Sequence, residues 1–246
     1  MNLLLINPNT STSVTDRIAG VARAAAAPST ELRAVTAPTG APYITTRAEA
    51  VLGAASVLEL LAAHADGADA VIIGAFADPG LGAARELLRV PVVGMAEAAM
   101  LTACMLGRRF AIVTFSVSLE PWYWECVDYN GLARRCAGVF CLDEPFSGIG
   151  DVAEEKAARL VELCGRAVAA GADVCILGGA PLAGLAAQLA EQVPVPLLDG
   201  VAAAVRQAET LAALRPRKAT AGSFRRPGFK PMTGLSPALR RLFEQG

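Results

Sequence analysis

The chain has 246 residues, of which 54% are apolar and 18% are charged, enough to bury one large core or two smaller ones. No run of 18 or more apolar residues is uninterrupted, so no membrane-spanning helix is expected. The net charge of −1 hides a basic tail, because residues 215–246 hold 8 Lys/Arg and 1 Asp/Glu. A basic tail can bind nucleic acid, but this one lacks interleaved aromatics and a basic helical face. We therefore expect a strap that docks on the acidic body of the protein.

Six cysteines are scattered along the chain with one histidine, His64, and they form neither a C-x-x-C pair nor a metal-ligand spacing. Residues 1–6 are too short and too uncharged for a signal peptide. These features predict a cytoplasmic protein with reduced, structural thiols and no metal site.

Apolar runs that end in turn residues alternate with helical segments along the whole chain. Strands are predicted at residues 3–6, 31–36, 70–74, 90–94, 108–114, 137–142, 174–178 and 195–199. Helices are predicted over residues 13–26, 46–64, 81–88, 97–106, from about 119, 152–170 and 200–214. This alternation is typical of parallel α/β units.

One stretch occurs twice. Residues 69–81, DAVIIGAFADPGL, and residues 173–182, DVCILGGAPL, both open with Asp and close their strand with Gly74 or Gly178. The repeat predicts two pseudo-symmetric lobes, each a four-stranded parallel sheet flanked by helices, with a cleft between them. We expect residues 1–97 plus 208–246 in the first lobe and 98–207 in the second. Ligands gather at the carboxyl ends of parallel strands, so the two loop tips are the expected site.

A polar loop follows the first strand. Asn7, Asn9 and Thr10 precede a predicted helix and can cap it, but backbone N–H groups at a helix start also bind anions. The residues alone leave capping and ligand contact as equal alternatives.

Five segments resemble the aspartate/glutamate/hydantoin racemase superfamily, and its hydantoin and allantoin racemase branch most of all. They are Asn7-Pro-Asn-Thr10 and residues 76–81, 93–98, 111–114 and 176–185. The resemblance covers roughly residues 1–214. It implies a two-lobed fold, a small anionic or imide substrate, cofactor-independent chemistry at a carbon acidified by a neighbouring carbonyl, and homo-oligomers.

The resemblance also implies two catalytic cysteines, one at each loop tip, that act on opposite faces of the substrate carbon. In this chain Ala75 and Gly179 stand at those positions, and neither side chain can carry a proton. None of the six cysteines is placed to substitute, so the two-thiol mechanism is disfavoured.

Other residues near the tips are candidates for the site. Asp78 and Glu97 are the predicted acid–base residues, because a carboxyl group shielded in a cleft can have a raised pKa. Their structural alternatives are capping of the helix that starts at Leu81 and interaction with a helix dipole. The predicted substrate-binding residues are Asn7, Asn9, Thr10, Ala75, Phe76, Thr114, Ser116, Gly179, Ala180 and Pro181.

Three hypotheses follow. The favoured one is an enzyme that acts on a hydantoin, a ureido acid or a compact carboxylate, either as a racemase or as a lyase, decarboxylase or hydrolase. The second is a binder of the same ligands without turnover. The third is an interaction module that uses the basic tail.

Overall fold

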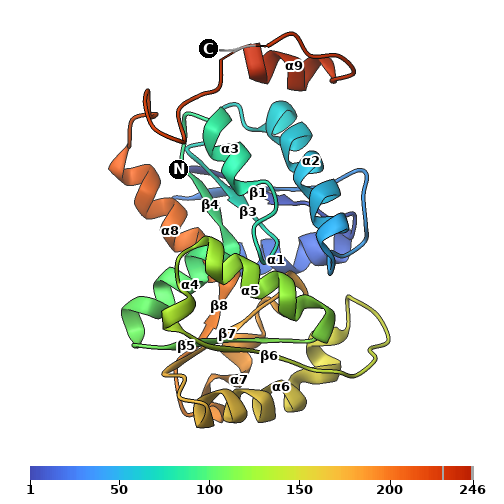
Figure 1. Ribbon diagram of the computed structural model, residues 1–246, viewed down its shortest axis with the longest axis vertical. Helices are drawn as coiled ribbons and strands as arrows, with labels where there is room; N and C mark the ends of the chain where they lie inside the picture. Colours follow the sequence, from blue (N-terminus) through green and yellow to red (C-terminus); the bar gives the residue numbers. More distant parts are fainter. Residues whose placement is uncertain (229, 245–246) are drawn as a thin grey trace.

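The computed structural model describes residues 1–228 and 230–244 and has two α/β lobes stacked on one another (Figure 1). Each lobe holds one four-stranded sheet, with the strand order β2-β1-β3-β4 in the first and β6-β5-β7-β8 in the second. All strand pairs are parallel. The predicted fold class is therefore confirmed, and the strands of the two sheets follow an equivalent order.

The first lobe is built from the elements that precede residue 95 and from two later helices. Its elements are β1 (Asn2–Asn7), α1 (Thr12–Ala25), β2 (Glu31–Thr36), α2 (Arg47–His64), β3 (Ala70–Ile73), α3 (Leu81–Leu87) and β4 (Val92–Gly94), with α8 (Gly200–Leu214) and α9 (Pro237–Glu244) packed against them.

The second lobe repeats this pattern with additional short 3-10 turns. Its elements are α4 (Met95–Leu106), β5 (Phe110–Thr114), η1 (Val117–Leu119), α5 (Glu120–Tyr129), η2 (Ala133–Arg135), β6 (Cys136–Cys141), α6 (Val152–Ala169), β7 (Val174–Leu177), η3 (Ala180–Leu182), α7 (Leu185–Leu189), η4 (Ala190–Gln192) and β8 (Leu197–Asp199).

The two copies of the repeated stretch form the equivalent strands β3 and β7. Every residue of both strands is buried, as expected for parallel strands covered by helices on both faces. The Asp that opens each copy ties the strand to its neighbour: Asp69 accepts a hydrogen bond from Asn2 N, and Asp173 accepts from Arg108 N and Arg109 N. The repeat thus fixes the same strand pairing in both lobes.

Helices α4 and α8 connect the lobes. Helix α4 follows β4 but packs on β7 of the second sheet, whereas α8 follows β8 and packs on α1 and β3 of the first lobe; the two helices also pack on each other. The chain therefore crosses between lobes twice. The predicted lobe boundaries at residues 97 and 208 stay a prediction.

The basic tail lies on the first lobe of its own chain, at the top of Figure 1. Lys218 and Arg226 donate to the main-chain oxygens of Arg85 and Leu87 in the last turn of α3. Cations are favoured at this end of a helix. The tail is not extended over its whole length, because residues 237–244 form helix α9, which packs against α2.

The other differences are small. Helix α4 begins at Met95 rather than at Glu97, and β8 begins at Leu197 rather than at residue 195. Among the described residues no helix combines the length and the apolar character that a bilayer span requires.

Candidate functional site between the two loop tips

A cavity lies between the loops that follow β1, β3, β5 and β7. It has a volume of about 20 Å³, which is roughly the room that one water needs. Its lining residues are Asn9, Tyr43, Ile44, Ala75, Phe76, Phe115, Tyr123, Gly179, Ala180 and Pro181. Both copies of the repeated stretch contribute, so the two loop tips do face one space.

Six of the ten predicted substrate-binding residues line this cavity: Asn9, Ala75, Phe76, Gly179, Ala180 and Pro181. The other four, Asn7, Thr10, Thr114 and Ser116, do not. Their role in substrate binding stays a prediction, and in the structure they form hydrogen bonds with other loop residues.

The buried Asn7 organises the first loop. Its side-chain amide donates to Asn9 Oδ1 at 3.0 Å and to Thr15 Oγ1 at 2.9 Å, while its Oδ1 accepts from Asn9 N. Ser11 N donates to Asn9 Oδ1 as well. These hydrogen bonds from Asn7 therefore fix the position of Asn9 on the cavity wall.

The remaining three residues contact other parts of the loops. Thr10 N donates to Ala41 O at 2.9 Å, and the Ser116 hydroxyl lies 2.8 Å from that of Ser118. Thr114 is fully buried, and its hydroxyl donates to Gly178 O at 2.6 Å. Thr114 thus ties the end of β5 to the start of the second tip.

The first tip presents only a methyl group. Ala75 is 6% exposed and lies directly after the glycine that closes β3. The loop then turns through Ala77 (φ 73°) and Asp78 (φ 55°), two non-glycine residues in the left-handed region. This backbone carries the Asp78 side chain away from the cavity.

The second tip has no side chain at all. Gly179 has φ +127°, a conformation that residues with a Cβ rarely adopt. A Cβ on Gly179 would also lie 2.9 Å from Cε1 of Phe115. The backbone conformation and the ring together leave no place for a thiol at this position.

Aromatic rings from both lobes close the cavity. Phe76 of the first lobe packs against Tyr123 of α5, with ring centroids 4.8 Å apart. Phe146 lies edge-on to Phe115 and to Tyr43, at 5.6 Å and 6.2 Å. The sequence-based list missed Tyr43, Ile44, Phe115 and Tyr123; for Tyr123 the available signal was the aromatic cluster in residues 122–124, just beyond a strand tip.

Tyr123 is the most deeply buried ionisable group on the cavity wall, with 2% of the residue exposed. Burial raises the pKa of its hydroxyl far above the ordinary value, and a hydrogen bond with Thr114 opposes that rise. The phenol therefore keeps its proton at neutral pH.

Asp78 does not reach the cavity. Its carboxylate accepts hydrogen bonds from Ala96 N and Glu97 N, both at 2.8 Å, at the start of α4. Burial raises the pKa of this carboxyl group from 3.8 to about 7, and the two backbone hydrogen bonds oppose the rise. The alternative that Asp78 caps the helix starting at Leu81 was therefore wrong. Asp78 caps α4, and Gly80 is the residue that precedes α3.

Glu97 also has a partner outside the cavity, since its carboxylate forms a two-point ion pair with Arg85 of α3. Asp78 instead borders a separate hollow of about 300 Å³ together with Trp122, Cys126 and Tyr129. The structure therefore does not bring the two predicted acid–base residues to the loop tips, and their catalytic role stays a prediction.

None of the six cysteines lines the cavity. Burial raises the pKa of Cys136 to about 11 and that of Cys141 to about 12, which keeps both thiols protonated and unreactive. Within residues 1–228 and 230–244, no group of three or more His, Cys, Asp and Glu side chains is placed to hold a metal ion.

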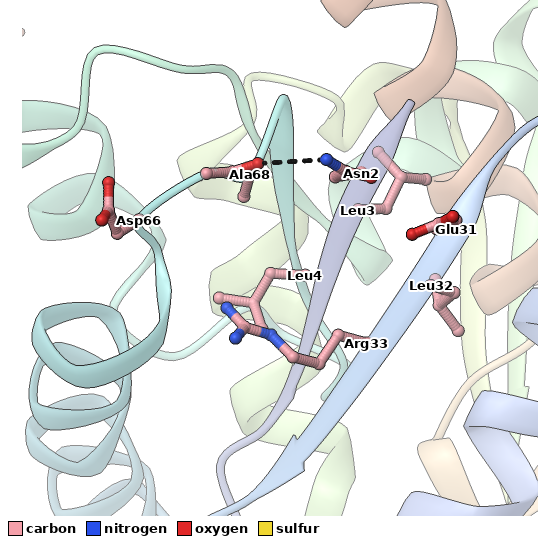
Figure 2. Close-up of a pocket in the computed structure, with 9 residues that line it drawn as sticks. Asn2, Leu3, Leu4, Glu31, Leu32, Arg33, Asp66 and Ala68 are labelled. Atoms are coloured by element: carbon pink, nitrogen blue, oxygen red, sulfur yellow. Dashed lines mark hydrogen bonds between the residues drawn. The ribbon is translucent and has the colours of Figure 1, made fainter.

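Another hollow lies at the opposite end of the first sheet. Figure 2 shows it where β1 and β2 begin, with Glu31, Arg33 and Asp66 around it. Arg33 donates to His64 O there. Because parallel sheets bind ligands at their carboxyl ends, the loop-tip cavity is the stronger candidate site.

Comparison with known proteins decides the family. The sequence model of the family described as Asp/Glu/Hydantoin racemase matches residues 3–208. The chain belongs to this family. The hydantoin racemase of Pseudomonas sp. (strain NS671) is 32% identical over 243 residues, which is 95% of each protein.

Solved structures of the family agree. The allantoin racemase from Klebsiella pneumoniae is 37% identical, with a TM-score of 0.91 over 97% of this chain and 98% of that one. The allantoin racemase of Pseudomonas fluorescens is 33% identical, with a TM-score of 0.87 over 95% of this chain and 100% of that one. The family resemblance inferred from the five motifs is therefore confirmed, and the chain is a racemase-like enzyme.

Proposed function

We propose that this member of the Asp/Glu/hydantoin racemase family transfers a proton on one face only of its substrate carbon. The substrate would be a hydantoin, a ureido acid or a compact carboxylate, and the reaction a lyase, decarboxylase or ring-opening step without a cofactor. One observation carries this proposal: the cavity is lined by Ala75 of the first lobe and Gly179 of the second, and neither side chain can carry a proton.

Inversion of a carbon needs an acid and a base on opposite faces of it. A methyl group at the first tip and a bare backbone at the second supply neither. A bond-breaking reaction needs less, because the electron pair of the broken bond moves into the neighbouring carbonyl group. One proton then has to be returned to the carbon, and a single donor is sufficient.

The polar groups around the cavity suit such a substrate. Asn9 supplies a carboxamide held by Asn7 and Ser11, and carboxamides hydrogen-bond carbonyl and imide groups. The aromatic wall shields the reacting carbon from water. Because the cavity is about 20 Å³, its walls have to move apart before a substrate of this size can enter.

A panel of substrates in D₂O tests the proposal. Hydantoins, allantoin, ureido acids and substituted malonates are incubated with the protein, and products are followed by NMR and chiral chromatography. We expect bond cleavage with one deuteron added and a single enantiomer formed. Enzyme-dependent conversion of one enantiomer into the other would refute one-face chemistry. Thermal stabilisation by a ligand that never reacts would instead favour a binder without turnover.

The setting of the enzyme is part of the same proposal. We propose a cytoplasmic homo-oligomer that does not bind nucleic acid: the cysteines are all free, and the basic tail uses Lys218 and Arg226 to bind its own first lobe. Sedimentation of the full chain tests the oligomeric state.

A further inference from the structure

Tyr123 projects from α5 into the space between the lobes. Its ring contacts Phe76 of the first lobe, and its Cε2 would lie 3.1 Å from a Cβ on Gly178. The ring therefore occupies the room above the two glycines of the second tip. This placement brings the phenol oxygen to one side of the cavity.

The hydroxyl lies beside the bare tip. A Cβ placed on Gly179 would be 3.7 Å from the oxygen of Tyr123, which is within the reach of a short side chain at that position. We propose that Tyr123 is the catalytic residue that delivers the proton to the substrate carbon from the Gly179 side. This inference rests on the proposed function and names the donor that it requires.

The phenol is suited to act as an acid. Burial raises its pKa, with smaller contributions from the nearby Cys141, Cys126 and Asp78, so the group is neutral when the substrate binds. A carbanion next to a carbonyl group is a stronger base than a phenolate, because the ordinary pKa of the phenol is only ~10.

The step balances without a further reactant. Cleavage leaves an electron pair on the substrate carbon, the O–H bond of Tyr123 breaks, the C–H bond forms, and a phenolate remains. The Thr114 hydroxyl, which donates to Gly178 O in the structure, lowers the pKa of Tyr123, and a rotation of this hydroxyl would let it donate to the phenolate. Water returns the proton to Tyr123 after the product leaves.

The cavity has one other phenol, Tyr43. It is half-buried and comes from the loop of the first lobe, where its ring packs against Phe146. The remaining lining residues are apolar, a glycine or the Asn9 carboxamide, and a carboxamide is not a proton donor of useful strength. Tyr129→Phe is the control for Tyr123→Phe, because both changes remove one hydroxyl from α5, while Tyr129 is 71% exposed and does not line the cavity.

A designed base on the opposite side isolates the role of Tyr123. Ala75→Cys places a thiol at the first tip, where the backbone has an ordinary φ. Each enantiomer of 5-benzylhydantoin is incubated in D₂O with Ala75→Cys alone and combined with Tyr123→Phe or Tyr129→Phe. We expect Ala75→Cys to exchange and invert, because its thiolate removes the proton and Tyr123 supplies one on the other face.

The expected loss is specific. With Tyr123→Phe added, inversion falls by about 100-fold or more, the usual contribution of a general acid, while exchange with retention continues. With Tyr129→Phe added, inversion stays within about threefold. Inversion that survives Tyr123→Phe would overturn the inference. Melting curves of all variants confirm that they fold.

Two further readings separate this inference from the proposed function. If the parent converts a substrate of the panel and Tyr123→Phe converts it equally fast, the inference fails and the one-face proposal stands. If the parent is inert but Ala75→Cys inverts in a Tyr123-dependent manner, the one-face proposal fails and the inference stands. If Ala75→Cys is inert, the deciding measurement is an NMR titration of the ¹³Cζ-tyrosine-labelled protein with 5-benzylhydantoin. A Tyr123 signal that does not move when the hydantoin is added overturns the inference.

Discussion

Gly94 leaves open the space that the Asp78 carboxylate occupies. A Cβ on Gly94 would lie 2.3 Å from Asp78 Cγ, closer than any tolerable contact, and Gly94 is the residue that precedes α4. The loop after β3 can therefore reach the first turn of α4 only because residue 94 has no side chain.

In the second lobe, an Asp carboxylate likewise joins the loop after β7 to the start of a helix, here α8. Asp199 stands at the start of α8, where it accepts from Val201 N and Ala202 N, and it also accepts from Gly184 N in the loop after β7. In one lobe the loop provides the carboxylate, and in the other the helix cap provides it. Both arrangements fix a loop tip to the helix that crosses to the other lobe.

Gly94→Ala should destabilise the fold by about 2–3 kcal/mol, because overpacking a tight site typically costs about 1–3 kcal/mol. Urea denaturation measures the loss. In an Asp78→Ala background the same substitution should cost at least about 1 kcal/mol less, since residues in contact show coupling of this size. Equal costs in the two backgrounds would show that the crowding does not involve Asp78.

Asp78 should make stability depend on pH. Its pKa is about 7 in the folded chain, against 3.8 ordinarily, so the folded state holds the proton over the interval in which the unfolded state has released it. The contribution of this group to stability is thus full below about pH 4 and is lost as the pH rises through about 7, by up to about 4 kcal/mol.

Asp78→Asn removes this titration. Between pH 4 and 8 the free energy of unfolding should fall more steeply in the parent than in the variant, as measured by urea denaturation across the interval. Asp16→Asn, at an exposed position of α1, controls for the change in net charge. Parallel profiles for the parent and Asp78→Asn would contradict the prediction.

The two sheets, and the loop tips that line one cavity, could be predicted from the sequence because both rest on local signals that occur twice. The apolar runs of β3 and β7, their opening Asp and their closing Gly define strand, pairing and tip. The partners of Asp78 and Glu97 could not be predicted in this way. Asp78 lies next to Pro79 and close to Leu81 in the sequence, but its partners are residues 96 and 97, and such a long-range contact depends on the absence of a side chain at Gly94.

The aromatic wall was hidden for a similar reason. Tyr43, Phe115 and Tyr123 belong to three separate elements, and nothing in their local patterns shows that they converge. Helix α9 was missed because Pro and Gly dominate the tail. Its stability depends on packing rather than on propensity, since it has only eight residues and short helices are marginal alone.

The tail should stabilise the first lobe measurably. Leu239 of α9 is 6% exposed, so Leu239→Ala should lower the free energy of unfolding by about 2 kcal/mol, at the lower end of buried Leu→Ala changes. Leu214→Ala is the matched control, because Leu214 is 70% exposed and surface changes stay within about 0.5 kcal/mol. Equal effects of the two changes would mean that α9 does not dock in solution.

Gly179→Ala should separate backbone conformation from crowding when it is compared with Gly131→Ala. Gly131 has φ +68° and open space around its Cβ position, whereas Gly179 has φ +127° and the Phe115 ring 2.9 Å away. We expect Gly131→Ala to cost about 1–2 kcal/mol, the usual strain of a left-handed residue, and Gly179→Ala to cost more.

Phe115→Leu tests the source of the excess. If the ring blocks the tip, the additional cost of Gly179→Ala over Gly131→Ala should shrink when Phe115→Leu is present, as measured by urea denaturation of the single and double variants. The backbone contribution should remain, because no change at residue 115 alters φ of Gly179. A side chain at residue 179 therefore requires both a change of the backbone φ and a shift of the Phe115 ring. A single Gly179→Cys substitution should thus yield a destabilised protein without racemase activity. Full stability together with inversion of 5-benzylhydantoin in that variant would show that the second tip can accept a thiol after all.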